Sequence, residues 1–158
     1  MVRLADLPDT DRENMLKKIP TLPRFDGRPW VRGPELRKMR VAIVSTAGLH
    51  LRGDRPFGAG GASMDYRVIP CYVQASELVM SHMSVNFDRS GFQDDWNVAF
   101  PLDRLRALES EGIVGSVAEY HYSFMGAVSP VTLYEPKARE LAKHLHNDKV
   151  DAVLLSPV

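Results

Sequence analysis

The sequence has little that would tie it to a membrane, a nucleic acid or a disulfide-stabilised fold. Its 20 Lys and Arg residues balance 20 Asp and Glu residues, so no net charge attracts it to nucleic acid or to an anionic membrane surface. No apolar run approaches the roughly 18 residues that span a bilayer, and the N-terminus lacks the apolar segment of a signal peptide. The single cysteine, Cys71, excludes an internal disulfide and a multi-thiol metal site. These absences predict a cytoplasmic protein with no nucleic-acid partner and no membrane partner.

The residues that are present suit one globular domain preceded by an arm. Of the 158 residues, 44% are hydrophobic, which is enough to bury a core. Residues 9–19 predict a short helix, and residues 20–34 are dense in Pro and Gly, which favours an extended arm over regular structure. We therefore divide the chain into an N-terminal helix with a Pro/Gly-rich arm, residues 1–39, and a folded α/β domain, residues 40–158.

Apolar β-branched runs and amphipathic helical patterns alternate along this second part. Strands are predicted at residues 40–48, 66–72, 76–82, 113–119 and 150–155, and helices at residues 102–111 and 133–147. Strands that alternate with helices predict an α/β fold, with a mostly parallel sheet and flanking helices in a doubly wound arrangement.

Four polar segments follow predicted strands of this sheet. They are residues 48–65, 82–97, 119–126 and 156–158. In open α/β sheets, ligands bind beyond the carboxyl ends of the strands, where the loops converge. We therefore expect the four segments to face one crevice.

Two histidines are the candidate proton donors of that crevice, His82 and His121, because imidazole exchanges protons near neutral pH. Each has an alternative role as a hydrogen-bonded structural residue. Asn86 and Asp88 lie close to His82 in the sequence, and they could orient it or hold a substrate amine or carboxylate. We expect no metal site, because no pair among His50, His82 and His121 has the spacing of helix-borne metal ligands.

Five phrases stand out in the second part, and the order and spacing of the first four are hard to obtain by chance. They are NxD at residues 86–88, PLDRLR at 101–106, EGIVGSVA at 111–118, HYSFMG at 121–126 and VDAVLLSPV at 150–158. Together they resemble the selenoprotein B family of glycine, sarcosine, betaine and D-proline reductases, especially the shorter subunit of the D-proline reductase type. The resemblance covers residues 40–158 and likens them to the N-terminal part of the family's domain.

The resemblance implies a reductase that cleaves a carbon–nitrogen bond of an amino acid or amine with electrons from a dithiol. In that family the attacking group is a selenolate, which is ionised at neutral pH, where a cysteine thiol is mostly protonated. A cysteine a few residues later resolves the selenium adduct as a selenenyl sulfide. The chain itself is expected to hold no cofactor.

In the family this redox motif follows the strand that residues 150–158 resemble. The sequence has no selenocysteine and no CxxC, so the resemblance implies a selenocysteine immediately after Val158 in a full-length protein. Selenocysteine is encoded by UGA, which ordinary translation reads as a stop, and we therefore expect the fold to be truncated there on its C-terminal side. The 158-residue chain alone is expected to be inactive.

The resemblance also suggests roles for the crevice residues. His82 and His121 are candidate donors of a proton to the leaving amine, and the guanidinium of Arg52 or Arg89 is suited to a substrate carboxylate. The other candidate substrate-binding residues are His50, Asn86, Asp88, Asn97 and Ser156.

The family works as multi-subunit complexes, so the expected partners are other reductase subunits or further copies of the chain, besides a small amino-acid or amine substrate. Two alternatives remain open. One is a non-catalytic small-molecule-binding or regulatory subunit with the same crevice, and the other is an enzyme that uses only His, Asp and Arg. The resemblance alone does not select one substrate among these amines.

Overall fold

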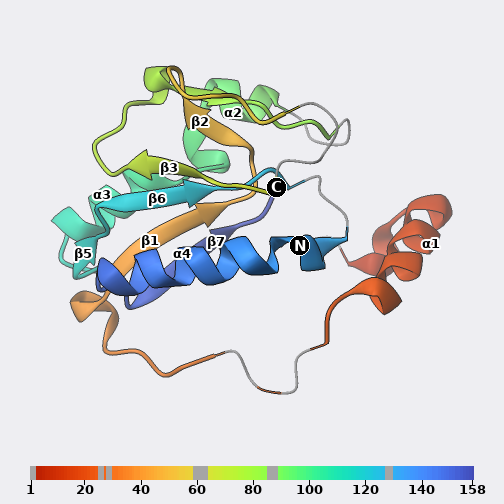
Figure 1. Ribbon diagram of the computed structural model, residues 1–158, viewed down its shortest axis with the longest axis horizontal. Helices are drawn as coiled ribbons and strands as arrows, with labels where there is room; N and C mark the ends of the chain where they lie inside the picture. The colour runs from red at the N-terminus through yellow and green to blue at the C-terminus, as the bar shows by residue number, and fades with distance from the viewer. Residues whose placement is uncertain (1–2, 25–26, 28–29, 59–63, 85–88, 127–129) are drawn as a thin grey trace.

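The fold consists of a central sheet with helices on both faces (Figure 1). The protein is described here by a computed structural model, which covers residues 3–24, 27, 30–58, 64–84, 89–126 and 130–158. Helices on both faces of a mostly parallel sheet confirm the predicted α/β class.

The central strand of the sheet is β1 (Arg40–Ser45), an apolar run buried on both faces. On one side it pairs in parallel with β7 (Ala152–Ser156). On the other side it pairs in parallel with β5 (Ser116–Val117) and then with β6 (Tyr120–Ser123). The outer strand β3 (Arg67–Pro70) pairs with β6 in the antiparallel direction. The sheet is therefore mixed but mostly parallel.

One predicted strand differs from its expected place, and two segments predicted to be polar loops contain strands. β2 (Leu49–Leu51) and β4 (Leu78–Met80) form a separate antiparallel pair, so the strand predicted at residues 76–82 is shorter and lies outside the main sheet. The segment 119–126, which its polar residues predict to be a loop, instead supplies β6. Two of its polar side chains, His121 and Ser123, are buried and hydrogen-bonded within the fold, and alternation of apolar residues does not reveal such a strand.

The two longer helices of the domain cover opposite faces of the sheet. α3 (Leu102–Ser110) packs through Leu102 and Leu105 against the face that carries Val41 and Ile43. α4 (Glu135–Asn147) lies in front of the sheet in Figure 1 and packs Leu141 against the other face. Both match their predicted ranges. A buried leucine of this kind contributes about 1.5 to 3 kcal/mol, which is why the apolar stripe decides which face of each helix turns inward.

The N-terminal part of the chain contributes little to this core. α1 (Asp9–Lys18) matches the predicted helix but buries none of its residues, and Figure 1 shows it beside the sheet rather than on it. The division at residue 39 stays a prediction. The remaining elements are α2 (Ser90–Asp94) and the 3-10 turns η1 (Leu4–Asp6), η2 (Ile19–Thr21), η3 (Leu36–Lys38), η4 (Ala75–Glu77), η5 (Trp96–Val98) and η6 (Val131–Tyr134). Within the described ranges, no helix has the length and apolar character needed to cross a membrane.

Candidate functional site

The carboxyl edge of the parallel strands is marked by three serines in register. Ser45 of β1 lies opposite Ser123 of β6 and Ser156 of β7. The hydroxyls of Ser45 and Ser156 both donate to the carbonyl of Ala99, at 3.0 and 2.9 Å. The hydroxyl of Ser123 accepts the amide of Leu49 at 2.9 Å. Ser156, a predicted substrate-binding residue, therefore lies at the expected edge with its hydroxyl already bonded to the protein.

Thr46 holds the residues that follow β7 at this edge. Its amide donates to the carbonyl of Ser156 at 3.2 Å, which extends the pairing of β1 with β7 by one step. Its hydroxyl accepts the amide of Val158 at 2.9 Å and donates to the carbonyl of Val158 at 3.3 Å. The backbone that follows β7 is thus fixed along the strand ends rather than directed away from them.

Gly48 brings a second segment against the same edge. Its φ of 65° is a conformation that glycine adopts without strain. Its amide donates to the carbonyl of Phe124 at 2.8 Å, and its carbonyl accepts the amide of Ser81 at 2.9 Å. A Cβ at this position would lie 3.0 Å from the amide nitrogen of His82. The absence of a side chain at Gly48 therefore permits His82 to approach the end of β1.

His82 is buried at this edge, with 3% of its surface exposed. Its Nδ1 accepts the amide of Ser84 at 3.2 Å, and its carbonyl accepts a hydrogen bond from the guanidinium of Arg89. Burial, and then the positive charge of Arg89, lower the pKa of His82. His82 is therefore mainly neutral at pH 7, and donation of a proton from its imidazolium form would be favoured at lower pH.

His50 lies behind this edge and is also buried, with 2% of its surface exposed. Its Nδ1 is 2.8 Å from the carbonyl of Leu51, and its Nε2 is 2.8 Å from the hydroxyl of Ser81. Because a carbonyl can only accept, Nδ1 donates to Leu51. These two bonds tie β2 to the segment that follows β4, and they occupy both ring nitrogens of a predicted substrate-binding residue.

His121 lies inside the sheet. Its Nδ1 accepts the amide of Ile43 at 3.0 Å, its ring meets Phe100 edge-on, and none of its surface is exposed. Burial, and then the charge of Arg106, lower the pKa of His121 to about 4. Its assignment as a proton donor stays a prediction, while its contacts give it a structural role in the sheet.

The remaining predicted residues are distributed around the fold. Arg52 donates to the carbonyl of Ser76 at 3.0 Å. Asn97 bonds Asp95 and accepts the amide of Asp103 at 3.0 Å, and so caps the start of α3. Asn86 and Asp88 lie outside the described residues. The structure thus brings His82, Arg89 and Ser156 to the carboxyl edge, whereas Arg52 and Asn97 are bonded elsewhere.

Sequence reasoning missed Thr46 and Gly48 because it placed both within the predicted strand, residues 40–48, whereas β1 ends at Ser45. A residue just beyond the carboxyl end of a parallel strand is where ligands are expected, so position was the available signal. In the parts of the chain that the structure describes, no three His, Cys, Asp or Glu side chains are grouped to hold a metal ion.

The two bonds of Thr46 lead to a test of how residues 156–158 are held. In Thr46→Val, which keeps the shape of the side chain but lacks the hydroxyl, we expect hydrogen exchange of the Val158 amide to rise about fivefold, since a hydrogen bond contributes about 1 kcal/mol. Amide exchange measured by NMR provides the rates. Thr132→Val, at an exposed threonine, is the matched control and should leave the Val158 rate unchanged. An equal rate in Thr46→Val would show that these bonds do not hold the segment.

Comparison with known proteins gives a consistent result. The sequence model of the glycine/sarcosine/betaine reductase selenoprotein B family matches residues 15–158. D-proline reductase subunit gamma of Acetoanaerobium sticklandii is 34% identical over 123 residues, which cover 77% of this chain and 50% of that protein. Betaine reductase complex component B subunit beta of Peptoclostridium acidaminophilum is 30% identical over 124 residues, covering 77% and 28%. Glycine reductase complex component B subunit gamma of Symbiobacterium thermophilum is 26% identical over 140 residues, covering 87% and 32%. The chain thus spans half of the first relative and about a third of the others, and no solved structure matches it significantly.

Proposed function

The chain belongs to the glycine/sarcosine/betaine reductase selenoprotein B family, and from this membership we propose that it is part of a subunit of a reductase complex. The reaction that we propose for the complex is reductive cleavage of a carbon–nitrogen bond in an amino acid or amine. The names of three relatives, which are subunits of D-proline, betaine and glycine reductases, support this class of substrate.

The proposed reaction is a two-electron reduction. The substrate C–N bond breaks, and the carbon and the nitrogen each gain a hydrogen. A dithiol supplies both electrons and both protons and is oxidised to a disulfide. We propose that the attacking group is a selenocysteine located after β7, in a longer form of the protein. A selenolate needs no neighbouring base to be ionised at neutral pH.

The observation that carries this proposal is the way Thr46 holds the backbone that follows β7. Both polar groups of Val158 bond to the Thr46 hydroxyl, at the edge where Gly48 also admits His82. A residue that follows Val158 along this path would start from the carboxyl ends of the strands, where α/β folds bind their ligands. In this arrangement His82 lies at the same edge, and we propose it as the donor of a proton to the leaving amine.

The outer strand of the sheet supports assembly with other subunits. β7 pairs with β1 on one side, and three of its residues, Val153, Leu154 and Leu155, are 38%, 42% and 64% exposed. An exposed apolar strand at the edge of a sheet is a surface that another chain or segment can cover. We therefore propose that β7 lies at a contact within the assembled reductase.

A non-catalytic binding or regulatory subunit is the second candidate. The observation that favours it is the position of Cys71, the single thiol of the sequence. Cys71 directly follows Pro70 at the end of β3, and its amide donates to the carbonyl of Glu119, which follows β5. β3 runs antiparallel to β6, so Cys71 lies at the opposite end of the sheet from Ser45 and Gly48. A ligand at the carboxyl edge would therefore not meet this thiol.

One assay separates these candidates. Glycine, sarcosine, betaine and D-proline are incubated with the 158-residue chain and with the assembled complex, each with and without dithiothreitol, and both ligand binding and turnover, as release of amine or ring opening, are measured. We expect turnover only by the complex and only with dithiol. Ligand binding without turnover in any sample supports the regulatory subunit, and turnover by the chain without dithiol supports an enzyme that uses only His, Asp and Arg. Sequencing the DNA that follows the Val158 codon tests the selenocysteine directly, because we expect UGA followed by an open coding frame.

A further inference from the structure

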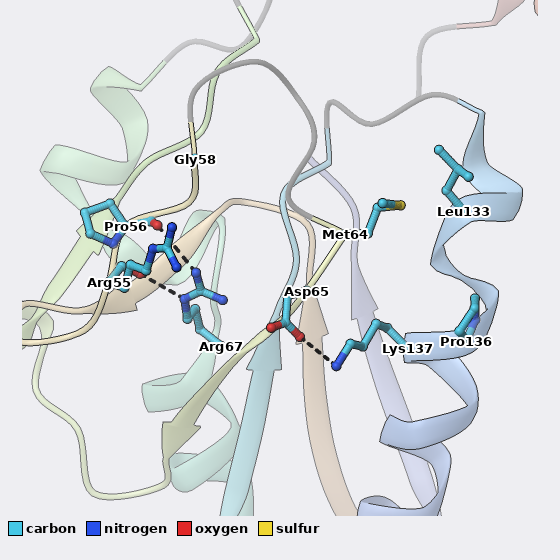
Figure 2. Close-up of a pocket in the computed structure, with 9 residues that line it drawn as sticks. All are labelled: Arg55, Pro56, Gly58, Met64, Asp65, Arg67, Leu133, Pro136 and Lys137. Atoms are coloured by element: carbon cyan, nitrogen blue, oxygen red, sulfur yellow. Dashed lines mark hydrogen bonds and ion pairs between the residues drawn. The ribbon is translucent and has the colours of Figure 1, made fainter.

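A cavity of about 680 Å³ lies between the loop after β2, the start of β3 and the first turn of α4 (Figure 2). Among the described residues that line it, Arg55, Arg67 and Lys137 are cationic and Asp65 is anionic. Arg67 pairs with Ser123, the last residue of β6, so the cavity lies beside the carboxyl edge of the sheet. Its volume is typical of sites for small molecules.

Arg67 forms the wall of this cavity. Its guanidinium donates to the carbonyls of Arg55 and Pro56 at 3.0 and 3.4 Å, as Figure 2 shows. The same group stacks over the ring of Phe57, 4.5 Å from its centroid. The charge of Arg67 is thus used to fix the backbone of the segment that carries Arg55.

Arg55 can offer its positive charge to a ligand, whereas the guanidinium of Arg67 is bonded within the fold. Its guanidinium makes no hydrogen bond or ion pair with any residue that the structure describes, although its backbone is held in place. Arg52 and Arg89, the two arginines that the sequence suggested for a carboxylate, instead donate to the carbonyls of Ser76 and His82. A guanidinium stays charged at any physiological pH and binds a carboxylate through two parallel hydrogen bonds.

Asp65 supplies the opposite charge in the same cavity. It is 3.2 Å from Lys137, whose ammonium is also 3.0 Å from Glu140. The carboxylate of Asp65 is half exposed and has room for a further donor. In the view of Figure 2, Asp65 lies between Arg67 and Lys137. The cavity is therefore lined by both cationic side chains and a carboxylate, and a zwitterionic amino acid carries a group complementary to each.

We propose that this cavity binds the amino-acid substrate, with the guanidinium of Arg55 pairing with its carboxylate and Asp65 accepting from its amine. This inference rests on the proposed function for the identity of the ligand, and on the guanidinium of Arg55, which bonds none of the described residues, for the residue that selects it. An anion without an amine, such as inorganic phosphate, matches only half of the arrangement.

Binding to the 158-residue chain tests the inference separately from catalysis. Glycine and D-proline are titrated into labelled protein, each in parallel with its carboxamide and with inorganic phosphate, and shifts of the amide signals of residues 53–58 and 64–67 are followed by NMR. We expect at least one of the two amino acids to shift these signals, and to bind at least tenfold more weakly to Arg55→Gln, because the variant loses the hydrogen bonds between the guanidinium and the carboxylate. The carboxamide is expected to bind weakly to both proteins. Arg104→Gln, at an exposed arginine of α3 on the opposite face, is the control and should bind like the wild type.

The outcomes separate this inference from the proposed function. Equal affinity of wild type and Arg55→Gln, equal binding of acid and carboxamide, or tighter binding of phosphate than of either amino acid overturns the role of the cavity, even where the complex is an active reductase. If binding depends on Arg55 but the complex shows no reductase activity, the amino-acid-binding role of the cavity is supported and the proposed reaction is refuted. In an active complex, Arg55→Gln should raise KM at least tenfold and leave kcat within about twofold, because the residue binds the part of the substrate that does not react.

Discussion

Acidification from pH 7 to pH 4.5 is expected to lower the free energy of unfolding of the wild type by about 2 to 3 kcal/mol more than that of His121→Asn. The measurement is urea denaturation at a series of pH values, followed by circular dichroism. The expected effect comes from one side chain that is neutral and fully buried in the folded protein.

The direction follows from the pKa of His121 in the two states. In the unfolded chain the imidazole has its ordinary pKa near 6.5, whereas burial lowers it to about 4 in the folded protein. Between these values the unfolded state binds a proton that the folded state excludes, so stability falls as pH falls through this range. Above pH 6.5 both states are neutral and the contribution is constant. Below pH 4 both are protonated, and no further loss comes from this residue.

The location of His121 explains why the folded state excludes that proton. Val41 pairs with Val117, and Val44 pairs with Tyr122, so three steps along β1 face five steps along the β5–β6 segment. The two extra residues interrupt the ladder and leave the amide of Ile43 without a backbone partner at this point. Nδ1 of His121 accepts a hydrogen bond from that amide, and a protonated Nδ1 could not accept one.

Asparagine is the informative replacement because its Oδ1 can occupy the position of Nδ1 and accept the same amide, yet it does not titrate. His121→Asn should be less stable than the wild type at pH 7, since it loses ring contacts with Phe100, but its stability should change less between pH 7 and pH 4.5. His146→Asn, at an exposed histidine of α4, controls for the replacement of a histidine by asparagine and should follow the wild type. Parallel pH curves for wild type and His121→Asn would contradict the assignment.

His121 also shows where prediction from the sequence stops. The buried strand β1 and the helices α3 and α4 could be predicted, because each has an apolar pattern that only one kind of element can bury. β6 could not be predicted, because it buries His121 and Ser123, whose hydrogen-bond partners lie 78 and 74 positions away in the sequence. A polar residue that is satisfied by a distant backbone group looks the same in the sequence as a loop residue.

The candidate site divides in a similar way. The carboxyl edge could be predicted from strand order, and His82, Arg89 and Ser156 are found there. Their hydrogen bonds could not be predicted, and neither could the guanidinium of Arg55, which bonds no side chain or carbonyl among the described residues, because charge on a loop does not reveal which arginine is already bonded to a carbonyl. What a sequence lacks in this case is the identity of the partner of each polar group, which only the fold supplies.

Gly48→Ala is expected to lower the free energy of unfolding by about 2 to 5 kcal/mol and to displace His82 from the end of β1. The positive φ of 65° costs an L-residue about 1 to 2 kcal/mol. The added methyl would also lie 3.0 Å from the amide nitrogen of His82, and a forced contact in a packed region costs about 1 to 3 kcal/mol. The backbone on either side of this contact cannot shift easily. The amide of Gly48 donates to the carbonyl of Phe124, and its carbonyl accepts the amide of Ser81, the residue before His82.

Two other glycines of the same chain separate these contributions, with urea denaturation as the measurement. Gly112 has a φ of 70° and open space around it, so Gly112→Ala should lose only the backbone part, about 1 to 2 kcal/mol. Gly53 has no heavy atom within 4 Å of an added Cβ and no positive φ, so Gly53→Ala should stay within about 0.5 kcal/mol of the wild type.

A loss in Gly48→Ala no larger than that in Gly112→Ala would mean that the segment carrying His82 moves freely away from the strand. In that case the close approach at Gly48 would not position His82, and reductase activity of the folded variant should equal that of the wild type. If the contact does position His82, we expect the folded variant to lose at least tenfold in kcat, because a small displacement of a reacting group is costly.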